Sequence, residues 1–183
     1  MGWTHKVWIF IATGTSTTID FTSLSLPGSS AGPALDDVGL FGGGIPAFLP
    51  IGQGCPGTAG TPLLSPNQLP RIGHPFSFIV YNLPLNQLGL AFLGFSSQSW
   101  GGYSLPLSMT PFGMDGCTLY TSVDIAQLVP DLGIFGTYIW GTQIPSDPGL
   151  LGVYFGMQFL VNDPGANSAG LILSNAGFGL IGA

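Results

Sequence analysis

Hydrophobic residues along this chain come in short runs that alternate with polar residues and end at Gly, Pro or Asn. Residues 76–81 read Phe-Ser-Phe-Ile-Val-Tyr, and residues 88–95 form the next apolar run. A period of two between turn-forming residues is typical of β-strands. Further strands are expected at residues 103–109, 117–125, 134–144, 151–161 and 171–180. This spacing predicts an all-β fold, an antiparallel β-sandwich of the jelly-roll or immunoglobulin-like kind.

The beginning of the chain has a different pattern. An uninterrupted apolar run comes first: Val7, Trp8, Ile9, Phe10 and Ile11. Both faces of such a strand are apolar, as in a strand that is covered on both sides, and we interpret the run as a strand rather than as a signal peptide. Ile19 and Phe21 then alternate with Thr and Asp, which predicts a second strand. A two-stranded ribbon is marginal by itself, so we expect it to pack on its own sandwich or to add a strand to a neighbouring copy.

Gly and Pro divide the chain into regions. Residues 46–60 are rich in both and are expected to be a linker. Residues 1–45 then form an N-terminal β-strand extension, and residues 61–183 form the sandwich domain. The extension is the candidate intersubunit donor strand.

Composition supports the β assignment and excludes several functions. The chain has 30 Gly and 16 Pro but only two basic and eight acidic residues, with a net charge of -6. Gly and Pro break helices, and nucleic-acid binding needs clustered Lys and Arg. The same count argues against anionic membrane surfaces. Since no apolar stretch approaches the ~18 residues of a spanning helix, no membrane-spanning segment is expected.

The two cysteines, Cys55 and Cys117, indicate the cellular compartment in which the protein works. An even cysteine count, without other metal ligands beside them, favours a disulfide and an extracellular or cell-surface location. Closing this loop would stabilise the fold by roughly 4 kcal/mol in the chain-entropy model. Two buried thiols are the alternative.

Catalytic signals are weak. General acid-base catalysis needs positioned titratable groups, and here only His5, His74 and the Asp residues supply them. Residues 28–32 match the G-x-S-x-G pattern of hydrolases, but Pro33 follows at once and no helical pattern comes after it. We therefore expect a protein that is not an enzyme and that uses no cofactor.

Aromatic residues are the remaining candidate site: Trp100, Tyr103, Trp140 and Tyr154. Their flat rings with a polar edge suit stacking on sugar faces and need no charge. Core packing is the alternative and is favoured, because Trp140 and Tyr154 lie in the strongest apolar runs.

Two resemblances add to this interpretation. Residues 8–12, 15–23 and 32–38 resemble the closing strands of galactose-binding-like jelly-roll domains of secreted proteins. That resemblance implies a structural calcium held partly by Asp36 of Leu-Asp-Asp-Val. The rest of such a domain is missing and calcium needs six to eight oxygens, so a solvated turn is favoured over a metal site.

The second resemblance covers residues 52–183. Motifs such as Gly54-Cys55-Pro56-Gly57 and Gly113-Met114-Asp115-Gly116-Cys117 are similar to the Gly- and Pro-rich C-terminal β domains of large secreted bacterial proteins. It implies secretion and a β fold, and it names no substrate.

The sequence therefore predicts a secreted structural protein, a self-assembling subunit of an extracellular filament or surface layer. Subunits would join by strand exchange, so the expected partners are other copies of the chain. The alternative is a carbohydrate-binding or adhesion module of a larger secreted protein, with a polysaccharide as its partner.

Overall fold

The computed structural model describes residues 16–22, 38, 44–129 and 135–183. Residues 44–129 and 135–183 belong to one compact unit, and residues 16–22 and 38 belong to another. All the strands described below lie in the first unit.

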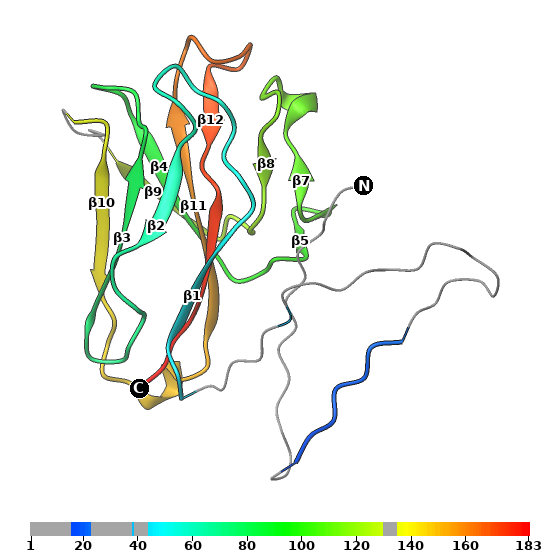
Figure 1. The fold of residues 1–183 in the computed structure, drawn as a ribbon, viewed down its shortest axis with the longest axis vertical. Helices are drawn as coiled ribbons and strands as arrows, with labels where there is room; N and C mark the ends of the chain where they lie inside the picture. Colours follow the sequence, from blue (N-terminus) through cyan, green and yellow to red (C-terminus); the bar gives the residue numbers. More distant parts are fainter. Residues whose placement is uncertain (1–15, 23–37, 39–43, 130–134) are drawn as a thin grey trace. The chain divides into compact units, whose positions relative to one another are not determined.

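The larger sheet of this unit has the strand order β1-β13-β11-β4-β9, and β12 pairs with β11 beside this path (Figure 1). Its strands are β1 (Ala47–Ile51), β4 (Gly89–Gly94), β9 (Ile125–Val129), β11 (Tyr154–Asn162), β12 (Leu171–Leu173) and β13 (Ala176–Leu180). Each of these pairings is antiparallel. The 3-10 helix η2 (Pro148–Leu150) precedes β11.

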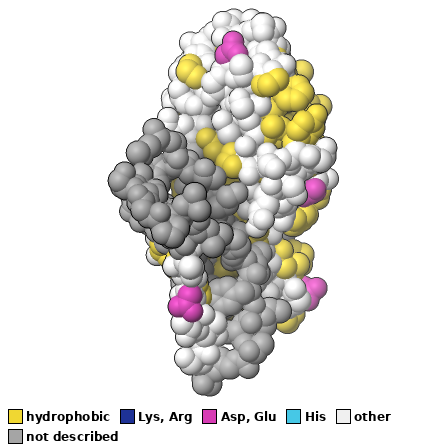
Figure 2. All heavy atoms as spheres, turned by 90° about the vertical axis from the view of Figure 1, so that its right-hand side faces the viewer, with side chains coloured by type: hydrophobic (Ala, Val, Ile, Leu, Met, Phe, Trp, Pro, Cys, Tyr) yellow, Lys and Arg dark blue, Asp and Glu magenta, His cyan; other side chains and the backbone are white. Residues whose placement is uncertain are grey.

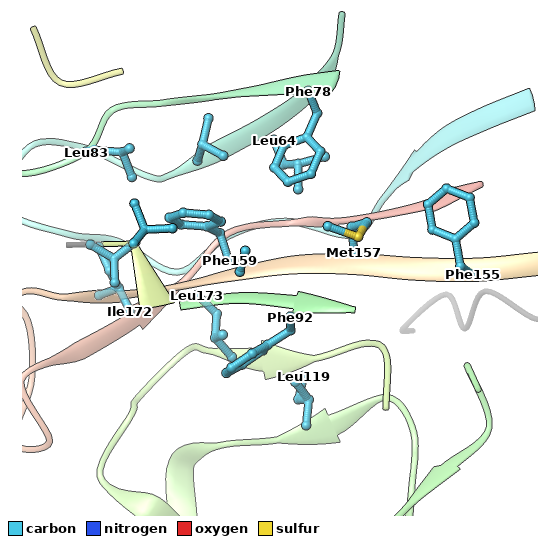
Figure 3. Packing of buried hydrophobic residues seen from close by; sticks show 14 of the residues in the cluster. Leu64, Phe78, Leu83, Phe92, Leu119, Phe155, Met157, Phe159, Ile172 and Leu173 are labelled. Carbon is cyan, nitrogen blue, oxygen red and sulfur yellow. The ribbon is translucent and has the colours of Figure 1, made fainter. Parts of the chain in front are cut away.

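The smaller sheet packs on one face of the larger sheet and has the order β10-β3-β2. Its strands are β2 (Leu63–Pro66), β3 (Pro75–Tyr81) and β10 (Tyr138–Gln143). Alternate side chains of β3 and β11 fill the space between the sheets (Figure 3). These buried residues are Phe76, Phe78 and Val80 on β3, and Phe155, Met157, Phe159 and Val161 on β11. The predicted all-β fold with packed antiparallel sheets is confirmed.

A third layer covers the other face of the larger sheet. It is the segment between β4 and β9, with β5 (Ser99–Trp100), β6 (Tyr103–Ser104), β7 (Leu107–Ser108), β8 (Thr118–Leu119) and the 3-10 helix η1 (Thr110–Phe112). The Gln158 side chain of β11 accepts a hydrogen bond from the N–H of Tyr120 at 2.9 Å and donates one to the carbonyl oxygen of Thr118 at 2.8 Å. The central strands are therefore buried on both faces, which explains their apolar residues at both parities.

Glycine makes this close approach of the third layer feasible. Gly156 lies on the covered face of β11, where an added Cβ would collide with the side chain of Thr121. On β4, its register partner Gly94 would collide in the same way with the backbone of Ser122. Gly at these two positions lets the segment lie directly on the sheet.

The predicted disulfide is confirmed. Cys55 and Cys117 are bonded, with their Cα atoms 4.7 Å apart, and both are buried. The bond joins the third layer, just before β8, to the segment that follows β1. It thus fastens the covering layer to the sandwich.

The segment expected to be a linker, residues 46–60, contains a strand of the larger sheet. β1 pairs along its whole length with β13, from Ala47 opposite Leu180 to Ile51 opposite Ala176. The Gly and Pro content of residues 46–60 suggested a linker, but β1 contains a single proline, Pro50, and an edge strand tolerates a missing N–H on its outer side. The sheet therefore starts at Ala47 rather than near residue 61.

The N-terminal ribbon was predicted to include a strand around Ile19 and Phe21. Within the chain itself, residues 16–22 adopt no strand and both side chains are exposed, so the donor strand stays a prediction. Alternation supplies the side-chain pattern of a strand but not the neighbouring strand that its backbone needs. The other predicted donor residues, Val7 to Ile11, lie outside the described residues.

Candidate functional site

An open hollow of about 450 Å³ lies beside the β5–β6 hairpin. Gly101 and Gly102 form the two-residue loop of this hairpin, with φ angles of 56° and 88°. Positive φ at both loop positions is the geometry of a type I′ turn, which Gly adopts without steric cost. The turn places Trp100 directly opposite Tyr103. Their Cβ atoms are then about 5 Å apart on one face of the hairpin, since directly opposed residues share a face.

Both rings at the hollow are accessible to solvent. Trp100 is 37% exposed and Tyr103 is 53% exposed. The indole N–H of Trp100 donates a hydrogen bond to the carbonyl oxygen of Val123 at 3.2 Å, which holds the indole against the segment before β9. Trp100 is therefore both fixed in position and open on its ring surface.

A carboxylate borders the same hollow. One oxygen of Asp124, Oδ2, accepts hydrogen bonds from the N–H of Phe95 and from the hydroxyl of Ser122, both at 2.7 Å. The Ser122 hydroxyl also accepts a bond from the N–H of Ser96 at 3.0 Å. These bonds tie the end of β4 to the start of β9 and fix the carboxylate before any ligand arrives.

Trp140 lies elsewhere, at the rim between the two sheets. Its ring stacks on Phe78, with centroids 5.2 Å apart and planes inclined by 16°. Its indole N–H donates a hydrogen bond to Oε1 of Gln127 on β9 at 3.1 Å. Packing against the core and a bond between the sheets account for Trp140 without a ligand.

Tyr154 packs on the covered face of the larger sheet. Its ring stacks on Phe178, with centroids 5.3 Å apart and planes inclined by 5°. Its hydroxyl oxygen is buried and has no hydrogen bond of good geometry within the described residues. Burial raises the pKa of this hydroxyl well above its usual value, and the nearby Ser97 side chain offsets the rise only in part. The four aromatic residues are thus divided into an exposed pair and a packed pair.

Charge is sparse around the hollow. Among the described residues that line it, Asp124 alone carries a charge. On the face shown in Figure 2, isolated acidic side chains and hydrophobic patches stand out from uncharged polar surface. A ligand at the hollow therefore meets aromatic rings, hydroxyl groups and a single negative charge.

Within the described part of the chain, no group of three or more His, Cys, Asp or Glu side chains is placed to hold a metal ion. Asp36, the candidate calcium ligand, lies outside the described residues. No helix among residues 16–22, 38, 44–129 and 135–183 is long and apolar enough to cross a bilayer.

The fold and the hollow define the chain as a disulfide-linked antiparallel β-sandwich that presents an aromatic hairpin. No protein-family model, curated protein or solved structure matches it. The two resemblances seen in the sequence therefore stay predictions.

Sequence reasoning did not single out Asp124 or Ser122. Nothing in the local sequence distinguishes Asp124 from the other Asp residues, because its contacts arise only when the ends of β4 and β9 meet. The pairing of the two rings had a usable signal: Gly-Gly between Trp100 and Tyr103 is typical of a two-residue hairpin loop, which brings flanking residues together.

Proposed function

We propose that the protein is a secreted carbohydrate-binding module that holds a neutral polysaccharide at the β5–β6 hairpin. The observation that carries this proposal is the pair of exposed rings, Trp100 and Tyr103, which lie directly opposite each other on the hairpin next to the Asp124 carboxylate. A flat ring suits the C–H face of a sugar, and nearby polar groups suit its hydroxyls. The disulfide supports an oxidising, extracellular setting.

The charge of the protein and the number of carboxylates at the hollow narrow the range of sugars that it could bind and the chemistry that it could perform. The Asp124 carboxylate and the net charge of -6 disfavour uronic acids and sulfated sugars, because like charges repel. Glycoside hydrolysis generally uses two carboxyl groups that flank the bond, whereas a single one lines this hollow among the described residues. Binding without cleavage is the role that this arrangement supports.

Pull-down with insoluble neutral polysaccharides, alongside acidic ones, tests the proposal. We expect Trp100→Ala and Tyr103→Ala each to weaken retention by about five- to tenfold, from loss of a stacking contact of about 1 kcal/mol. Phe112→Ala is the matched control, since Phe112 is an exposed ring on η1 that does not line the hollow. Failure of the wild-type protein to bind any of the neutral polysaccharides contradicts the proposal, as does full retention by Trp100→Ala.

A second function is favoured by a separate observation, the exposed segment of residues 16–22. We propose that residues 1–45 donate a strand to another copy, which makes the protein a self-assembling subunit of a filament or surface layer. Ile19 and Phe21 carry the alternation of a strand and are exposed, and no described strand pairs with them. A segment of this kind gains backbone hydrogen bonds by adding to an open sheet edge.

Negative-stain images of the full chain test self-assembly. We expect fibres or sheets from the wild-type protein, and their loss in an Ile19→Pro variant, because Pro removes the N–H that a strand donates. Ser16→Ala, a substitution in the same segment that keeps every backbone N–H, is the control. Fibres that survive Ile19→Pro unchanged contradict a donor role for this segment.

A further inference from the structure

The two lateral sides of the sandwich differ in how their edge strands are protected. On one side lie β1 and β2. β1 contains Pro50, which has no N–H to offer a further strand. On β2, the Asn175 side chain accepts a hydrogen bond from the N–H of Leu64 at 2.6 Å and donates one to its carbonyl oxygen at 3.0 Å. An amide side chain thus occupies the place of the next strand, and this side is closed.

The opposite side is formed by β9 and β10, which the bond from Trp140 to Gln127 holds together. Neither strand contains Pro or a charged residue. Each strand has an apolar side chain that is mostly exposed: Leu128 is 59% exposed and Ile139 is 62% exposed. Proteins normally protect an edge with Pro, Lys, a bulge or a covering segment. On this side, the described residues provide none of these within the strands.

A row of leucines leads across the larger sheet to the β9 edge. Leu160 of β11 lies opposite Leu90 of β4, and Leu90 lies opposite Leu128 of β9. Directly opposed residues share a face, so the three side chains form one continuous row. Leu90 and Leu160 are half-buried, whereas Leu128, at the edge, is mostly exposed. The row ends where a further strand would continue it.

We propose that the β9 edge accepts residues 16–22 of a second copy, with Ile19 or Phe21 placed beside Leu128. This inference rests on the proposed self-assembly and adds the acceptor. The segment fits the edge because it has the length of β9 with a residue to spare on each side, alternates apolar and polar residues, and brings only one charge, Asp20. β9 is then a central strand, and the donated apolar residue extends the row beyond Leu128.

Such a contact is heterologous, because the donor and the acceptor are different surfaces of the chain. Any row of joined copies keeps one free donor at one end and one free acceptor at the other, so copies add head to tail. This asymmetry gives a sharp test with two full-length variants. The double variant Ile19→Asp/Phe21→Asp disrupts the donor segment and leaves the acceptor edge intact. Leu128→Lys disrupts the acceptor edge and leaves the donor segment intact.

Sedimentation velocity over a concentration series measures the outcome. We expect the wild-type chain to form a ladder of oligomers, and each variant alone to associate at least about tenfold more weakly, since a charge is placed opposite an apolar row. An equimolar mixture of the two variants should form 1:1 dimers and stop there, because one good donor meets one good acceptor. Leu49→Lys, at a leucine of the closed-side strand β1 that is 41% exposed, is the matched control and should behave like the wild-type chain.

The outcomes separate the two levels of the proposal. A wild-type chain that stays monomeric throughout the series overturns self-assembly and the acceptor together. A wild-type ladder that Leu128→Lys leaves unchanged, as Leu49→Lys does, overturns the β9 acceptor alone. Dimers that form in each variant by itself overturn the head-to-tail arrangement.

Discussion

Trp100 and Trp140 show how one residue type serves two regions of this molecule. Each lies on a strand, and each donates its indole N–H to a group on or next to β9. Trp140, however, belongs to a sheet that faces another sheet, so its ring stacks on Phe78. Trp100 belongs to a hairpin of the covering layer, and its ring lines an open hollow. Whether a tryptophan ring packs in the core or faces solvent therefore depends on the layer to which its strand belongs, and not on the apolar residues beside it in the sequence.

The largest effect is expected from removing the link between these two regions. The Cys55–Cys117 bond closes a sequence separation of 62 residues and fastens the covering layer to the sandwich. Replacing both cysteines with Ser should lower the free energy of unfolding by about 4 kcal/mol, because the unfolded chain regains the entropy of an open loop. Urea denaturation followed by intrinsic fluorescence measures this loss.

The wild-type protein in the same non-reducing buffer is the reference for that measurement. If the hollow depends on the covering layer being held down, glycan binding by the double Ser variant should weaken at urea concentrations below the main transition. A loss of less than about 1 kcal/mol would mean that packing alone holds the layer in place.

The two tryptophans themselves give the next largest contrast. Trp140→Ala should lower the free energy of unfolding by about 3 kcal/mol, because it empties a packed site against Phe78. Trp100→Ala should lower it by less than about 1 kcal/mol, since one face of the ring already meets solvent. Chemical denaturation of the two variants side by side is the measurement. Trp140→Phe keeps an aromatic ring but removes the indole N–H, so it separates the contribution of ring packing from that of the hydrogen bond. Equal losses of unfolding free energy in Trp140→Ala and Trp100→Ala would contradict the contrast.

Much of the sandwich was predictable because its strands follow a period of two between clear turn signals. The apolar runs at residues 76–81 and 88–95 match β3 and β4 closely, and the even cysteine count matched the disulfide. The run at residues 134–144 contains β10, although the strand begins only at Tyr138. The local sequence pattern is enough to predict a strand when each face of that strand lies wholly in the core or wholly in solvent.

The remaining features depend on contacts between distant segments. The pattern of residues 16–22 favours a strand, but a strand needs a partner that the pattern does not supply. β1 was missed because Pro50 and the Gly and Pro residues around the strand are typical of linkers, and a proline within a strand is tolerated at an outer edge. The hollow was half predictable: Gly101 and Gly102 indicate the hairpin, whereas Asp124 reaches it only through the pairing of β4 with β9.

The smallest effect separates the two tyrosines of the aromatic set. The hydroxyl of Tyr154 is buried and has no hydrogen bond of good geometry within the described residues, so Tyr154→Phe should raise the free energy of unfolding by up to about 1 kcal/mol at neutral pH. Tyr103→Phe, on the exposed hairpin, should leave it unchanged. Urea denaturation of both variants at pH 7 measures the difference.

Alkaline pH enlarges this difference in a direction fixed by the pKa. Burial raises the pKa of Tyr154 in the folded state above its ordinary value of 10.0. Above pH 10, the unfolded chain releases this proton while the folded chain retains it, so the wild-type free energy of unfolding falls as the pH rises. Tyr154→Phe lacks this loss, and its advantage over the wild-type protein should grow between pH 10 and 11. A constant advantage across that range would show that the hydroxyl ionises as readily in the folded protein as in the unfolded chain.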